Sequence, residues 1–110
     1  MLKENYAVRE LRLWLPVAAN TPDVQVLLKS ITKAAGGVTK CATEGTDADG
    51  TTEPVLVMHW CVFDDWGANL ALGDLCEVVR VLLSQGQNAV LVDYGDGNGP
   101  TLYYDEPISG

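Results

Sequence analysis

The chain has few cations. Lysine and arginine together number 7 in 110 residues, against 15 aspartates and glutamates, so the formal net charge is −8 at pH 7. Nucleic-acid backbones and anionic membrane surfaces attract proteins largely through clusters of lysine and arginine. We therefore expect no direct binding to nucleic acid or to a membrane.

Long apolar runs and paired cysteines are also absent. No stretch approaches the roughly 18 apolar residues that cross a bilayer, and the residues after Met1 do not form a signal peptide. The cysteines Cys41, Cys61 and Cys76 are odd in number and widely spaced, so they make no disulfide framework. These features predict a cytoplasmic protein whose cysteines act as small apolar side chains.

The chain does hold enough apolar material for one core. Hydrophobic residues make up 47% of the sequence, an ordinary share for a globular protein. A chain of this length seldom divides into two cores. We predict a single domain over residues 1–105, followed by a flexible tail over residues 106–110.

The spacing of apolar residues predicts alternating strands and helices. Leucines at every second position from Leu11 to Leu15 indicate a half-buried strand over residues 6–17. Further strands are predicted over residues 38–44, 54–63, 88–94 and 101–104. Two helices separate them, the first starting at Thr21 and stopping at Gly36, the second following the segment of residues 64–69 and stopping at Gly86. The predicted core consists of Leu11, Leu13, Leu15, Leu27, Leu28, Ile31, Leu75, Val79 and Leu82.

This order of elements predicts an α+β fold. Two right-handed β-α-β connections place both helices on one face of a four-stranded antiparallel sheet, the ferredoxin-like plait, with the first and third strands central. The turn at residues 96–100 then adds a C-terminal β-hairpin extension.

Two helix ends resemble those of a known group of proteins. The first predicted helix ends in Ala35-Gly36-Gly37-Val38-Thr39, and the second in Gln85-Gly86-Gln87-Asn88 before a valine-rich strand. With these segments, residues 20–94 resemble small uncharacterised ferredoxin-like proteins of bacteria, phages and plasmids. That group often carries Gly-x-Trp in the loop where this chain has Gly45-Thr46-Asp47. The resemblance implies a ferredoxin-like fold, a phage or mobile-element origin and, with that origin, the host cytoplasm.

One sheet face is expected to lack a helix cover. Arg12 and Trp14 alternate with the core leucines and so point to that face. One alternation of the third strand must join them, either Val55, Val57, His59, Cys61 and Phe63 or Leu56, Met58, Trp60 and Val62. Either choice leaves an apolar patch that a second copy or another partner would cover. Arg12, Trp14, Trp60 and the loop residue Trp66 are the candidate binding residues.

Catalytic and metal-binding motifs are sparse. His59 is the only histidine, and it shares a strand face with Cys61, with Cys41 as a conceivable third ligand. Structural zinc sites use four ligands, and no nucleophile motif such as Gly-x-Ser-x-Gly is present. We therefore predict no metal, no cofactor and no enzymatic activity.

The acidic residues suggest a second feature of the surface. Candidates for an acidic surface that meets a basic partner are Glu44, Asp47, Asp49, Glu53, Asp64 and Asp65. A solvated surface that keeps a small protein soluble is the plainer interpretation.

These features favour a non-catalytic binding protein that acts by stoichiometric association. With the resemblance, one example is a phage-encoded inhibitor of a host defence complex. A homodimer through the helix-free face and a basic protein partner are the expected associations. The alternatives are an oligomeric protein that binds a nucleotide or metabolite between subunits, and a small hydrolase or isomerase that uses His59.

Overall fold

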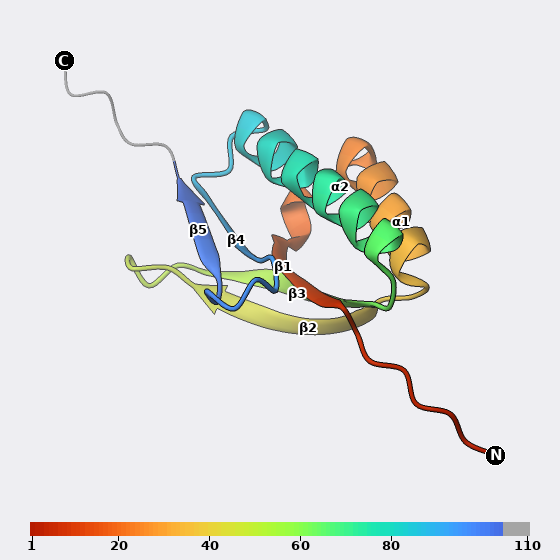
Figure 1. Ribbon diagram of the computed structural model, residues 1–110. Helices are drawn as coiled ribbons and strands as arrows, with labels where there is room; N and C mark the ends of the chain where they lie inside the picture. Colours follow the sequence, from red (N-terminus) through yellow and green to blue (C-terminus); the bar gives the residue numbers. More distant parts are fainter. Residues whose placement is uncertain (105–110) are drawn as a thin grey trace.

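The computed structural model describes residues 1–104 (Figure 1). The tail predicted for residues 106–110 lies outside the described residues. The elements are β1 (Arg9–Pro16), the 3-10 turn η1 (Val17–Ala19), α1 (Pro22–Ala35), β2 (Thr39–Thr46), β3 (Thr52–Val62), α2 (Asp65–Ser84), β4 (Ala89–Asp93) and β5 (Thr101–Tyr104).

All five strands form one antiparallel sheet in the order β2-β3-β1-β4-β5. The α+β class is confirmed, and β1 and β3 lie inside the sheet as predicted. The predicted hairpin of β4 and β5 is present, and β5 continues the same sheet at its edge. The sheet therefore has five strands where four were expected. β2 and β5 are the two edge strands.

Both helices cover the same face of this sheet (Figure 1). On that face, Leu13 of β1 lies opposite Met58 of β3, and Leu11 lies opposite Trp60. The register decides which alternation of β3 faces the helices: it is the one that contains Met58 and Trp60. The buried core consists mainly of Leu11, Leu13, Leu15, Val24, Leu28, Ile31, Met58, Trp60, Val62, Leu75, Val78, Val79, Leu82, Val90 and Val92. Leu27, which was predicted for the core, is only half-buried.

Trp60 is the first correction to the predicted binding residues. Its side chain is 0% exposed, and its indole Nε1 donates a hydrogen bond of 3.0 Å to Thr32 Oγ1 on α1. A buried indole needs such a partner for its one donor. Trp60 therefore anchors α1 to the sheet and does not reach the surface that a partner would meet.

The helix ends are held by specific contacts. Thr21 occupies the predicted N-cap position of α1, but its hydroxyl does not cap the helix. It accepts a 2.6 Å hydrogen bond from Gln85 Nε2 beyond the end of α2 and so ties the two helices together. Asp64 does cap α2, because its carboxylate accepts a hydrogen bond from the Gly67 N–H.

Gly67 also permits the close approach of α2 to α1. A Cβ atom at this position would lie 2.7 Å from the carbonyl oxygen of Ala34, which is too close for any side chain. Among residues 1–104, neither helix has the length and apolar character needed to cross a membrane.

The packing of α1 predicts a contrast between two of its residues. Leu28 is 6% exposed, whereas Val26 on the same helix is 67% exposed. Leu28→Ala should lower the free energy of unfolding by about 2–5 kcal/mol, because it leaves a cavity in the core. Val26→Ala should change it by less than about 0.5 kcal/mol. Urea unfolding followed by circular dichroism measures both, and equal effects would contradict the packing of α1.

Candidate functional site

The helix-free face of the sheet carries an apolar row that crosses all five strands. The β-sheet register places Trp14 of β1 between Val57 of β3 and Leu91 of β4. Cys41 of β2 lies beyond Val57, and Leu102 of β5 lies beyond Leu91. Side chains on neighbouring strands at the same level stand close enough to pack against one another. The row therefore forms one continuous apolar strip, as predicted for Trp14.

A groove adjoins this strip at Trp14, Leu91 and Leu102. It has a volume of about 510 Å³, and Trp14, Val55 and Leu91 are among the residues that line it. Glu44, Glu53 and Asp47 of the β2–β3 hairpin line it as well. The groove thus combines an apolar floor with an acidic rim, where Glu53 shares the face of Val55, whereas Glu44 pairs with Pro54 and its side chain lies on the helix-covered side. We call this half of the helix-free face, from the row of Trp14 to the β2–β3 hairpin, the apolar half.

Parts of the apolar half are open to solvent. Leu102 is 54% exposed and Tyr104 is 58% exposed, while Trp14 and Leu91 are half-buried. Isolated exposed apolar side chains are normal on a protein surface, but a contiguous set is typical of an interaction site.

The other half of the helix-free face is polar. Arg12 lies opposite His59 on β3 and opposite Asp93 on β4. One level further, Glu10 lies opposite Cys61. The change from apolar to polar takes place within a single step of two residues along β1, between Trp14 and Arg12.

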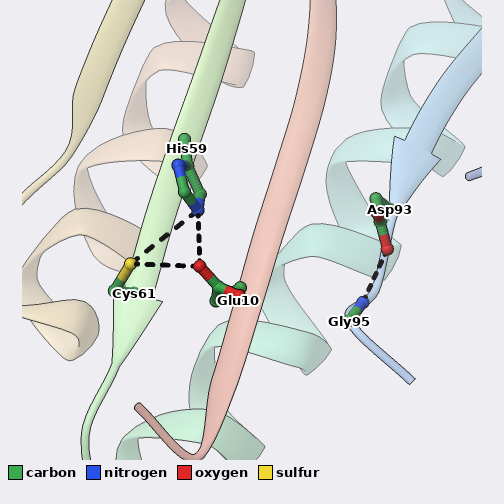
Figure 2. Close-up of polar contacts among 5 residues, drawn as sticks. All are labelled: Glu10, His59, Cys61, Asp93 and Gly95. Carbon is green, nitrogen blue, oxygen red and sulfur yellow. Dashed lines mark hydrogen bonds and ion pairs between the residues drawn. The ribbon is translucent and has the colours of Figure 1, made fainter. Parts of the chain in front are cut away.

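Three side chains of the polar half converge on one point (Figure 2). His59 Nε2 lies 3.3 Å from Glu10 Oε1 and 3.7 Å from Cys61 Sγ, and the sulfur lies 3.8 Å from the same carboxylate oxygen. The carboxylate oxygen accepts from the thiol and, when Nε2 carries a proton, from the imidazole. Among residues 1–104, these three form the one group of metal-ligating side chains that lie this close together.

The environment of Cys61 disfavours its thiolate. Burial, followed by the negative charge of Glu10, raises the pKa of the Cys61 thiol above its ordinary value, and Arg12 opposes this shift only in part. A nucleophilic cysteine needs a lowered pKa. The arrangement therefore weighs against a hydrolase in which Cys61 acts as nucleophile and His59 as base.

Glu10 is the member of this cluster that the sequence analysis missed. The alternation along β1 does place Glu10 on the same face as Trp14. Only the register of β1 against β3 shows that it faces Cys61. Cys41, the third ligand considered from the sequence, pairs with Val57 and does not belong to the cluster.

The remaining predicted residues lie elsewhere. Trp66 is 74% exposed at the start of α2, in the helix layer and not beside Trp14. Asp64 and Asp65 lie at that same helix start, where Asp64 serves as the cap. β3, with 11 residues and so a length of about 35 Å, separates them from the acidic β2–β3 hairpin. The predicted acidic surface is thus two separate regions.

Two local roles also emerge for predicted residues. Asp47 Oδ1 accepts hydrogen bonds from the backbone N–H groups of Asp49 and Thr51 at 3.0 and 2.9 Å, so it shapes the hairpin turn. Cys41 and Cys76 are exposed, so the prediction that all three cysteines act as small apolar side chains in the apolar runs does not hold for these two.

Comparisons of the chain with models of protein families, with curated proteins and with solved structures find no match. The resemblance to ferredoxin-like phage and plasmid proteins therefore stays a prediction.

The raised pKa of Cys61 predicts its chemical reactivity. At pH 8, iodoacetamide should alkylate Cys61 more slowly than the exposed Cys41 and Cys76, because its thiolate is disfavoured and its sulfur is half-buried. Glu10→Gln should speed the reaction at Cys61 by removing the nearby charge. Peptide mass spectrometry after timed labelling measures each site, and a Cys61 that reacts first would contradict this description.

Proposed function

We propose that the chain is a non-catalytic binding protein whose apolar half holds a basic segment of a partner protein in a stoichiometric complex. The observation that supports this most strongly is the groove with an apolar floor and a carboxylate rim. The fold we propose for it is the ferredoxin-like plait with a fifth strand. An inhibitory role against a host complex, and a phage origin, rest on the resemblance alone.

The groove matches a cationic amphipathic segment in two ways. Trp14 supplies the large, half-buried aromatic surface that contributes most to binding energy in many interfaces. Glu53, which shares the face of Val55, would attract a lysine or arginine side chain and orient the segment. The chain as a whole, at −8, would speed the encounter with a basic partner.

The same acidic rim makes a second copy of the chain a less favourable partner for the groove than a basic segment. In a two-fold dimer through this face, each copy would contribute its own Glu53 to the edge of the interface. Like charges at the edge of an interface oppose association. The homodimer stays a prediction, and the charge pattern favours a basic partner over it.

A peptide of alternating lysine and leucine is a defined probe for this proposal. Trp14→Ala should weaken its binding by about tenfold or more, because the substitution removes the aromatic floor. Trp66→Ala is the matched control, since Trp66 is exposed at the start of α2 and should not affect the affinity. Isothermal titration calorimetry at two salt concentrations measures the affinity and its electrostatic part.

Three outcomes would contradict the proposal. The first is an equal loss of affinity for the lysine-leucine peptide in Trp14→Ala and Trp66→Ala. The second is that a glutamate-leucine peptide binds as tightly as the lysine-leucine peptide. The third is that the unmodified chain does not bind the lysine-leucine peptide. Sedimentation velocity on the same samples reports self-association. A dimer that Trp14→Glu dissociates would assign the apolar half to a second copy instead.

A second candidate function, the binding of a small anion with an apolar body, is supported by a separate groove. It lies between α1 and the β2–β3 side of the sheet and has a volume of about 450 Å³. Three of the four lysines of the chain, Lys29, Lys33 and Lys40, line it. Leu56 and Met58 are among its apolar residues. This groove lies within one chain, whereas the alternative predicted from the sequence has a nucleotide or metabolite bound between two subunits.

Asn20 adds a polar group to this groove. Its Oδ1 is buried and accepts no hydrogen bond from any described residue, and Asn20 lines the groove. Buried acceptors without a partner are uncommon in proteins. A ligand donor or a water molecule at this point would satisfy the atom.

AMP and adenosine, which differ by the phosphate, test this second function. AMP should produce saturable shifts of the backbone amides of Lys33 and Lys40 in ¹H–¹⁵N NMR spectra, and adenosine should produce much weaker ones. Lys33→Glu should abolish the AMP effect, whereas Lys3→Glu, outside the groove, should preserve it. Equal effects of AMP and adenosine, or of the two substitutions, would contradict an anion site.

A further inference from the structure

We propose that Glu10, His59 and Cys61 form a three-ligand Zn²⁺ site on the polar half of the helix-free face, with the fourth coordination position open to solvent. The side chains offer one carboxylate oxygen, one imidazole nitrogen and one sulfur within 4.8 Å of one another. This site is independent of the groove that holds the proposed partner segment.

The three ligand atoms already stand at the spacing that tetrahedral zinc requires. Bonds of about 2.3 Å to sulfur and about 2.0–2.2 Å to nitrogen and oxygen, at tetrahedral angles, separate N from O by about 3.3 Å and S from either by about 3.6 Å. The observed separations are 3.3 Å for N to O, 3.7 Å for S to N and 3.8 Å for S to O. Each agrees to within about 0.2 Å, so an ion would enter with little movement of the side chains.

The backbone that carries the ligands is well fixed. Glu10 and Cys61 are register partners on the two interior strands, and His59 is two residues from Cys61 on the same strand face. The turn after β4 packs against the backbone of Glu10 at Gly95, where a Cβ atom would collide with that backbone. Ligands on paired interior strands are held more firmly than ligands on loops.

Space for a fourth ligand adjoins the cluster. A hollow of about 240 Å³ is lined by Thr39, His59, Cys61 and Phe63, among others. It is large enough for a water molecule or for a donor atom of another molecule. Three protein ligands with an open fourth position are typical of zinc sites that exchange a ligand, in contrast to closed structural sites.

The donor set favours zinc over the other abundant divalent cations. Ca²⁺ and Mg²⁺ take oxygen ligands almost exclusively. A sulfur, a nitrogen and an oxygen together suit Zn²⁺, and the carboxylate with the thiolate would offset its two positive charges. The sequence alone predicts no metal, because it places only His59 and Cys61 together, and the third ligand, Glu10, is brought to them by the strand register.

Cobalt titration tests the site, because tetrahedral Co²⁺ reports on its own ligands. The unmodified chain should bind one equivalent of Co²⁺ with a thiolate charge-transfer band and intense visible bands, and Zn²⁺ should displace it. Cys61→Ser should abolish the charge-transfer band. His59→Ala and Glu10→Gln should weaken binding by at least about tenfold.

The chain contains matched controls for two of the three ligand types, cysteine and glutamate. Cys41→Ser, Cys76→Ser and Glu53→Gln alter the same chemical groups outside the cluster and should leave the titration unchanged. Circular dichroism confirms that each variant is folded. The proposal is overturned by the absence of the charge-transfer band in the unmodified chain, by its persistence in Cys61→Ser, or by its loss in Cys41→Ser or Cys76→Ser. The lysine-leucine peptide titration on the metal-free chain tests the proposed function separately.

Discussion

The pairing of β1 with β3 determines both the core and the exposed face of this protein. Their antiparallel register sets Leu13 against Met58 under the helices and Arg12 against His59 on the opposite side. Because strand side chains alternate, a slip of one residue would exchange the two sets completely. The buried tryptophan Trp60, the apolar groove around Trp14 and the cluster around Cys61 all depend on this one register.

Much of the architecture was accessible from the sequence because it follows from local patterns. The alternation of leucines in β1 and the apolar stripe of α1 each specify a buried side without reference to the rest of the chain. Gly36 ends α1 in a left-handed conformation, with φ of +85°, as its position after the apolar stripe predicts. The sequence could not decide the orientation of β3, because both of its alternations are apolar.

The candidate site was harder to predict because it depends on contacts across strands. Trp14 was placed on the helix-free face by alternation within its own strand. Without the strand register, Glu10 could not be placed in one cluster with His59 and Cys61. Trp60 could not be excluded as a binding residue until the sheet face on which its side chain lies was known. Asp64 looked like part of an acidic surface, but its carboxylate is engaged in capping α2.

The distribution of charge gives the molecule two different surfaces. The helix-free face combines an apolar half with carboxylates on its rim and a polar half with the Glu10–His59–Cys61 cluster. Three lysines gather instead between α1 and β2, at the opposite side of the sheet. Such a separation favours ligands of opposite charge at the two places. The functions proposed above therefore do not compete for the same residues.

Nuclear Overhauser effects from the two tryptophan rings of the sheet test the register of β1 against β3 most directly. The indole protons of Trp14 should show contacts to the methyl groups of Val57 and Leu91, and those of Trp60 should show contacts to Thr32 and the core leucines. Contacts from Trp14 to Ile31 or Leu75 would instead place it beneath the helices. That result would contradict the register, and with it both sites on the helix-free face.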